Sequence, residues 1–349
     1  MMTDQNSTIR SLLRSGQVLE IGAQTHVRHK ISSSSRGAGP RLILAFAAIY
    51  LIWGSTYLAI RFAVESIPPL LMMGVRHLVA GSLLYAWVRL RGTPAPRLGQ
   101  WISAAIAGAL LFLGAHGSIA WAEQRVPSGL AALLSATLPL WVVLLARFKG
   151  RDRHLGWRAV LGLIVGFAGV AILIGPDGLH SNSQVSLLGA AAVLFGAFMW
   201  GLGTIYAQDA KLPSSSMLSA AMQMATGGIS LCCAGLLTGE ATRLHLATVT
   251  AKSALSLAYL IVFGSIIAFT AFTWLNTASS PTRVSTFAYV NPLVAVLLGW
   301  ALADEAIGVR TVIATAVILA SVALVNRRAH EPPKLKSRVE HEELEAVGD

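Results

Sequence analysis

The sequence predicts an all-α integral membrane protein in which ten transmembrane helices form two five-helix repeats of inverted topology. Hydrophobic residues make up 54% of the 349 residues and charged residues only 12%, against about 25% charged residues in an ordinary soluble domain. The mean hydropathy is +0.63. This composition excludes a disordered chain, a coiled coil and almost any water-soluble globule.

Ten apolar stretches, each bounded by charge, proline or glycine, are long enough to cross a bilayer once. A spanning helix needs about 20 apolar residues, and every backbone N–H and C=O group in the bilayer must be paired inside the helix. The loops between the stretches are too short to contain a soluble domain. The stretches lie near residues 42–63, 69–88, 101–122, 128–147, 157–175, 187–207, 215–237, 255–276, 282–302 and 310–326.

The distribution of Lys and Arg predicts the orientation of these spans. Most of them lie in the amino-terminal tail, in the loops after the second and fourth spans, and in the carboxyl tail. Cytoplasmic loops carry such an excess, so we expect both termini to be cytoplasmic and the chain to lie in the cell (inner or plasma) membrane. The same bias explains the net charge of +11, so membrane lipid is expected as a partner and nucleic acid is not.

The two ends of the chain read as polar tails. We interpret residues 1–41 as a flexible basic cytoplasmic tail, either a surface for anionic lipid or an incidental extension. No apolar core long enough for a signal peptide occurs in this tail. Residues 327–349 form the second cytoplasmic tail. The two cysteines, Cys232 and Cys233, are adjacent in an apolar run, so no disulfide framework is expected.

The two halves of the chain, residues 42–175 and 187–326, are related by an internal repeat. Trp121 and the Leu-Pro-Leu sequence that follows it recur 153 residues later as Trp274 and Asn-Pro-Leu. Because each half has an odd number of spans, the second half inserts upside down relative to the first. Inverted repeats are typical of secondary transporters, whose substrate sites lie at the repeat interface near the midplane.

Two prolines, Pro139 and Pro292, occupy matching positions in the middle of spans. Each lacks a backbone donor and frees one carbonyl of the preceding turn, so both are predicted helix breaks. Paired interruptions of this kind point to a binding site in repeat transporters, although a simple kink satisfied by a neighbouring helix is an equally good interpretation.

A series of short motifs runs through the chain in order. It reads Trp53-Gly54-Ser55-Thr56-Tyr57, Pro68-Pro69, Arg76, Ala122-Glu123, Pro127-Ser128-Gly129, Phe263-Gly264-Ser265-Ile266-Ile267-Ala268 and Tyr289-Val290-Asn291-Pro292. Together with the repeat, this series resembles the EamA type of the drug/metabolite transporter superfamily, and within it the YedA-like exporters. The resemblance covers about residues 42–326.

This resemblance implies a ten-helix metabolite carrier with a central cavity between the halves. It also implies net export, with amino acids or amphipathic drug-like solutes as the first expectation for the substrate. The chain departs from the family pattern at His77, His116 and Asp304, which puts the identity of the substrate in doubt but not the fold.

Polar and aromatic residues inside the spans are the candidate site. A charged side chain at the bilayer centre costs about 2.5 kcal/mol or more, so Arg76 is either a cavity residue or a structural arginine that reaches the surface. For His77, a packing role between helices is favoured. The predicted substrate-binding residues are Trp53, Ser55, Thr56, Tyr57, Arg76, Trp200, Asn276, Tyr289 and Asn291.

His116 and Glu123 are the candidates for proton or ion coupling. They are seven residues apart on the third span and lie nearly in line on one helix face. His116 can titrate near neutral pH. Glu123 either pairs with a cationic group or is an exposed cap near Arg125.

The spans and the inverted repeat predict a secondary transporter that works by alternating access, and the resemblance implies a central cavity and the export of small metabolites. The alternative is a membrane-embedded enzyme acting on lipid or prenyl substrates, but no DDxxD, HExxH or Cys/His cluster supports it. No phosphate-binding glycine loop is present, so gradients and not ATP would drive transport, and no cofactor or metal is expected. Small residues at Gly162, Gly166 and Gly169 serve either a homodimer or packing within the monomer.

Overall fold

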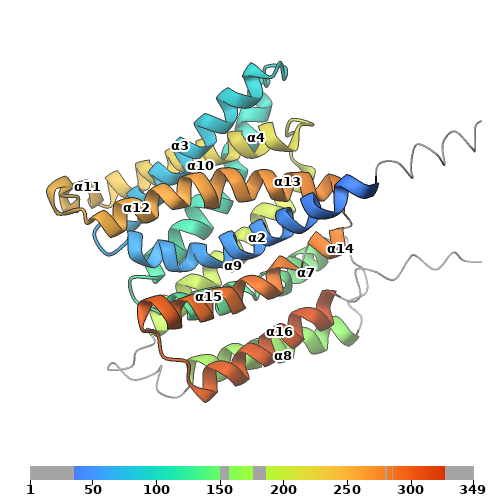
Figure 1. The fold of residues 1–349 in the computed structure, drawn as a ribbon, viewed down its shortest axis with the longest axis vertical. Coiled ribbons are helices and arrows are strands. Elements are labelled where there is room, and N and C mark those ends of the chain that lie inside the picture. The colour runs from blue at the N-terminus through green and yellow to red at the C-terminus, as the bar shows by residue number, and fades with distance from the viewer. Residues whose placement is uncertain (1–34, 150–156, 176–185, 280, 285, 327–349) are drawn as a thin grey trace, which may run out of the picture.

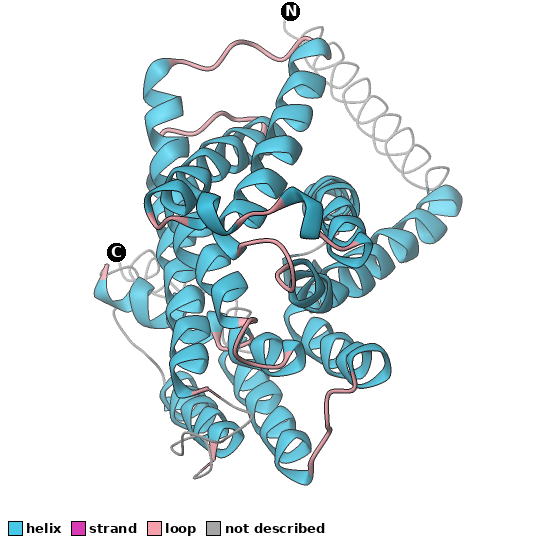
Figure 2. Cartoon of the chain, turned by 90° about the vertical axis from the view of Figure 1, so that its left-hand side faces the viewer, coloured by secondary structure: helices cyan, strands magenta, loops and turns pink. Residues whose placement is uncertain are grey.

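The computed structural model describes residues 35–149, 157–175, 186–279, 281–284 and 286–326. In this part of the chain all secondary structure is helical, and Figure 2 shows only helices and connecting loops there. Seven of the described helices are long and apolar enough to cross a bilayer, and three further apolar helices are shorter. The described part of the chain is therefore all-helical, as predicted, and its helices are of the kind that cross a membrane.

The helices of the first half follow the predicted apolar stretches closely (Figure 1). They are α2 (Ser35–Ala63), α3 (Pro69–Leu90), a third rod made of α4 (Leu98–Gly108), η1 (Ala109–Gly117) and α5 (Ser118–Ala122), a fourth made of α6 (Ser128–Ser135) and α7 (Leu138–Phe148), and α8 (Trp157–Ile174).

The second half repeats this order. Its helices are α9 (Leu187–Asp209), α10 (Ser216–Leu237), a rod made of α12 (Ala251–Tyr259), η4 (Leu260–Ile267) and α13 (Ala268–Ala278), then α14 (Pro281–Val284), α15 (Phe287–Ala303) and α16 (Val309–Asn326), with the short α11 (Glu240–Arg243) and η3 (Leu246–Thr248) before α12.

The boundary of the amino-terminal tail needs a correction. Helix α2 begins at Ser35 and contains Pro40, so residues 35–41 are helical, whereas we expected a flexible tail as far as residue 41. The φ angle of proline is compatible with a helix, and the bond that Pro40 forfeits would end in the first turn. Residues 1–34 and 327–349, which make up the rest of the predicted tails, lie outside the described part.

Helices of the two halves pack against each other in matched pairs. Helix α2 packs on α15 and helix α9 on α7. A Cβ atom at Gly54 of α2 would lie 2.6 Å from Cβ of Val294, and one at Gly201 of α9 would lie 3.4 Å from Cβ of Trp141. Gly54 and Gly201 each follow a tryptophan in the sequence, so glycine permits a close approach at the same point of both pairs.

Helices α8 and α16 lie side by side at one edge of the bundle (Figure 1). A Cβ atom at Gly166 would lie 2.9 Å from Oγ of Ser321, and one at Gly169 would lie 2.8 Å from Cγ1 of Ile318. These two small residues therefore serve packing within the chain.

The two matching prolines have different surroundings. Helix α6 ends at Ser135 and α7 begins at Leu138, so Pro139 stands in the first turn of a new helix. Pro292 lies inside α15, which is continuous. This corrects the expectation of a helix break at Pro292. In the second half, helix α15 begins before Pro292 and continues past it.

Candidate functional site

Two π-helical segments mark the centre of the candidate site. Segment η1 lies in the third rod of the first half, and η4 lies in the corresponding rod of the second half. π-Helical turns are rare, and they occur frequently at functional sites. Segment η1 carries Phe112 and His116, whereas η4 carries Gly264 and Ser265. The residues around these segments come from both halves.

Arg76 of α3 is held by η4. Its side chain is only 4% exposed, and Nε donates a hydrogen bond of 3.0 Å to Oγ of Ser265. A Cβ atom at Gly264 would lie 3.2 Å from Nη2 of Arg76. The absence of a side chain at Gly264 therefore leaves room for the guanidinium, which is buried inside the bundle.

Side chains of α2 also reach the third rod of the second half. Nε1 of Trp53 donates to the Gly264 carbonyl oxygen at 3.0 Å. Oγ of Ser55 donates to a carbonyl of its own helix and lies 2.6 Å from the hydroxyl of Tyr259, which donates to it. The hydroxyl of Thr56 donates to the Trp53 carbonyl at 2.6 Å. Of these three predicted residues, Trp53 and Ser55 join the halves directly.

The two histidines of the first half form a pair. Nε2 of His77 and Nδ1 of His116 are 2.8 Å apart, so one nitrogen donates and the other accepts. The ring of His116 lies 4.8 Å from the ring of Trp200, which belongs to α9 of the second half. Phe112 packs against His77 at 4.3 Å. His77 thus packs between helices and also bonds to a predicted coupling residue.

Glu123 is buried and is not the exposed cap that we considered. Its side chain is fully inaccessible, and neither carboxyl oxygen has a hydrogen-bond partner in the described residues. Its backbone carbonyl accepts a bond of 2.5 Å from Nη1 of Arg61. Arg125 bonds instead to the carbonyl of Trp121 and lies over the ring of that residue. The sequence could not show that Glu123 faces inward at the end of α5.

The electrostatic surroundings of Glu123 are mixed. Glu123 follows the end of the apolar span Leu98–Ala122. Burial raises the pKa of Glu123 well above its ordinary range, and the charge of Glu305 raises the pKa further, whereas Arg61 and Arg76 act in the opposite direction. Tyr57 lies within electrostatic range of the same carboxyl.

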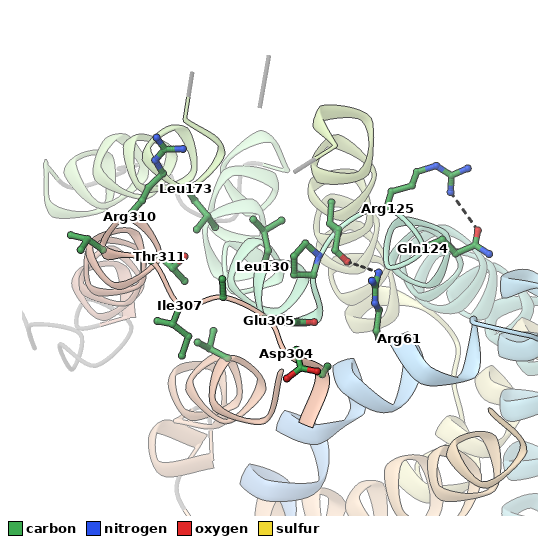
Figure 3. A pocket seen from close by; sticks show the side chains of 18 residues that line it. Arg61, Gln124, Arg125, Leu130, Leu173, Asp304, Glu305, Ile307, Arg310 and Thr311 are labelled. Carbon is green, nitrogen blue, oxygen red and sulfur yellow. Dashed lines mark hydrogen bonds between the residues drawn. The ribbon is translucent and has the colours of Figure 1, made fainter. Parts of the chain in front are cut away.

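A cleft of about 670 Å³ opens at the ends of several helices, and Gln124, the residue after Glu123, lines it (Figure 3). Arg61 lines it, together with Glu305 from the loop between α15 and α16. The carboxylate of Glu305 accepts bonds from the backbone N–H groups of Ser128 at 2.7 Å and Gly129 at 3.0 Å. A residue of the second half therefore caps helix α6 of the first half, where a negative charge is favoured.

The remaining predicted residues lie elsewhere. The hydroxyl of Tyr289 donates to the carbonyl of Val322 on α16 at 3.2 Å. Asn291 is 8% exposed, and its amide nitrogen reaches the carbonyls of Phe287 and Tyr50 when the amide is oriented to donate. Both therefore make contacts between helices. The side chain of Asn276 lies outside the described part of the structure.

Some residues of the site were not among those predicted. Ser265, Tyr259, Arg61 and Glu305 all hold predicted residues or helix ends. The motif from Phe263 to Ala268 was the one sequence signal for η4. It does not reveal which side chains of other helices the segment contacts.

Comparisons with known proteins agree with the arrangement. The model of the EamA-like transporter family matches residues 40–175 and again residues 187–327. The Escherichia coli (strain K12) protein named uncharacterized inner membrane transporter YedA is 40% identical over 283 residues, covering 80% of this chain and 89% of that protein. A chloroplastic WAT1-related protein of Arabidopsis thaliana is 24% identical over 281 residues, covering 79% of this chain and 67% of that protein.

A solved crystal structure shares the fold. It has a TM-score of 0.57 and 21% sequence identity, and the match covers 83% of this chain and 99% of that one. With the apolar helices described above, the matches confirm a multi-pass inner membrane protein of the transporter type. The family description and the name of the E. coli relative are those of transporters and not of enzymes.

Proposed function

The chain belongs to the EamA-like transporter family, and from that premise we propose that it exports small metabolites by alternating access. In this proposal ten helices cross the membrane, both termini are cytoplasmic, and the substrate binds between the halves. The observation that carries the proposal is the set of contacts across the halves around η1 and η4. These contacts are Arg76 with Ser265, Trp53 with Gly264, and His116 with Trp200.

The chemistry of these residues favours an amphipathic metabolite with an anionic group, such as an amino acid. The guanidinium of Arg76 uses Nε for Ser265, and its terminal nitrogens suit a carboxylate or phosphate. Trp53, Tyr57 and Trp200 add aromatic surface for an apolar or cationic part. We further propose Ser55, Thr56, Asn276, Tyr289 and Asn291 as residues that can form hydrogen bonds with the substrate during the cycle.

The paired packing of the halves supports alternating access. Helix α2 packs on α15 as α9 packs on α7, so the two halves make equivalent contacts. Two such packings of related energy give inward-open and outward-open states. Ion gradients would drive the cycle, with His116 and Glu123 as the groups that couple it to an ion. Gly166 and Gly169 of α8 pack within the chain, so they supply no argument for a homodimer.

The test is the uptake of a labelled metabolite panel into proteoliposomes that contain the full chain. Amino acids, organic cations and phosphorylated metabolites are the three arms of the panel, each with and without a pH gradient. We expect saturable uptake of one class that contains an anionic group. Uptake at the level of empty liposomes in all three arms would contradict the proposal.

A further inference from the structure

Glu123 differs from every other described glutamate on the same end of the bundle. Glu305 accepts two backbone N–H bonds, and Glu240 accepts one from Leu71 at 2.9 Å. Glu65 forms an ion pair with Lys252. Among these four glutamates, Glu123 is the one that is completely buried with no donor at either carboxyl oxygen.

An ionised carboxylate in such a position is costly, because nothing replaces the water that it loses. The protonated form loses much less hydration free energy on burial than the carboxylate does, and it can donate one hydrogen bond. The carboxylates of Glu305, Glu240 and Glu65 each have a hydrogen-bond donor or a cationic partner, whereas the oxygens of Glu123 have neither among the described residues. These surroundings therefore favour the protonated form of the Glu123 carboxyl. The group does not fit a structural role, which would require its oxygens to be bonded.

The charged and titratable groups that face Glu123 come from three elements. Helix α2 contributes Arg61 and Tyr57, helix α3 contributes Arg76, and the loop after α15 contributes Glu305. The recorded bonds of both arginines go to other groups. Arg61 donates to the carbonyls of Glu123 and Val126, and Arg76 donates to Ser265. Both arginines lie within electrostatic range of the Glu123 carboxyl.

We propose that the Glu123 carboxyl is the proton-binding site of the carrier, an inference that rests on the proposed transport function. A proton from the cleft lined by Arg61 and Glu305 adds to one Oε atom of the carboxylate. Its departure on the other side of the membrane restores the carboxylate, which Arg76 or Arg61 then neutralises. The described structure corresponds to the proton-loaded state, in which both arginines are engaged elsewhere.

The geometry favours Glu123 over His116 for this role. His116 already uses Nδ1 in its bond with His77, and its ring packs on Trp200. The carboxyl of Glu123 has both oxygens unbonded, and its backbone is bonded to an arginine that lines the cleft. Arg61 therefore connects the lining of the cleft to the backbone of Glu123.

The first experiment measures the proton without any substrate. The full chain is reconstituted in lipid, and the carbonyl stretch of protonated carboxyl groups is recorded by infrared spectroscopy at neutral pH. We expect a band in the wild type and in Glu65→Gln, which alters an exposed glutamate at the same end of the bundle. The band should be missing in Glu123→Gln. An unchanged band in Glu123→Gln would overturn the proposal, whatever the transport assay shows.

The second experiment uses the metabolite that the panel identifies. Exchange of labelled for unlabelled metabolite across the liposome membrane needs no net proton movement, whereas gradient-driven uptake does. We expect a pH gradient to accelerate wild-type uptake at least tenfold, and Glu123→Gln to retain exchange but lose this acceleration, with Glu65→Gln unchanged. A sodium gradient should have no effect on the wild type. Equal acceleration in the wild type and Glu123→Gln, or acceleration by sodium alone, would overturn the proposal.

The two experiments separate this inference from the transport proposal. If no metabolite is taken up, transport fails as a proposal while the infrared band still decides whether Glu123 holds a proton. If the wild type takes up a metabolite and the pH gradient does not change the rate of uptake, the transport proposal is supported and proton coupling through Glu123 is wrong.

Discussion

The two halves of the chain contain π-helical segments at corresponding places, but the two segments make different contacts. Both third rods contain a π-helical segment. Segment η1 presents bulky rings, His116 and Phe112, that pack toward Trp200. Segment η4 presents a glycine and a serine, which receive Trp53 and Arg76 from the other half. The difference teaches that η1 contributes aromatic rings, whereas η4 contributes the space and the bonds that hold Trp53 and Arg76.

The largest effect should come from filling the space in η4. In Gly264→Ala the new Cβ would lie 3.1 Å from Cγ2 of Thr56 and 3.2 Å from Nη2 of Arg76. If the Arg76 guanidinium binds substrate as proposed, displacing it should reduce uptake about tenfold, which corresponds to about 1.4 kcal/mol. Uptake by proteoliposomes measures the effect.

The matched control for that change lies in η1. In Gly114→Ala the new Cβ would meet Met199, at 3.0 Å from Cγ, and a methionine side chain can move. We expect little loss of uptake in this variant. Equal losses in both variants would break the comparison between the two segments.

Loss of the bond between Arg76 and Ser265 should have an effect of similar size. Hydrogen bonds to charged groups contribute about 1.5–3 kcal/mol, so Ser265→Ala should weaken the apparent affinity for substrate about tenfold through the orientation of Arg76. The half-saturation concentration for uptake measures it. Thr273→Ala is the control, because the hydroxyl of Thr273 donates to a carbonyl of its own rod. A normal half-saturation concentration in Ser265→Ala would show that η4 does not position the arginine.

The pH dependence of stability should sharpen the contrast between Glu123 and its neighbours. Since the pKa of Glu123 is raised in the folded chain, the folded state binds the proton more tightly than the unfolded one. The resulting stabilisation is fully present below the ordinary carboxyl pKa and is lost as the pH rises through the raised pKa. The free energy of unfolding should fall by about 1.4 kcal/mol for each pH unit between these two values. Thermal unfolding in detergent should show this fall in the wild type and not in Glu123→Gln.

The smallest effect should come from the two prolines. Pro292→Ala adds a backbone donor within a continuous helix, whereas Pro139→Ala alters the first turn of α7, where a proline forfeits little. We expect changes in the free energy of unfolding within about 1 kcal/mol for both. Thermal unfolding measures them, and a large loss in Pro292→Ala would show that the proline, and not the continuous helix, is the structural requirement.

The apolar helices could be predicted from the sequence because hydropathy acts locally along the chain. The Trp-Gly pairs at Trp53 and Trp200 occupy the positions where the halves approach closely, a contact that no pattern in the sequence predicted. The partners of Arg76 and Glu123 could not be predicted, since they depend on how the halves pack and on π-helical winding, neither of which has a periodic signal. Tyr289 and Asn291 share a span, yet their hydrogen bonds reach neighbouring helices that no local pattern specifies.

The central claim is that substrate binds where the two halves meet at Arg76. The most direct test is calorimetric binding of the transported metabolite to purified wild type, to Arg76→Gln, and to Arg91→Gln, whose arginine is exposed beside Trp87. The account predicts at least tenfold weaker binding in Arg76→Gln and unchanged binding in Arg91→Gln. Wild-type affinity in a folded Arg76→Gln protein would contradict it.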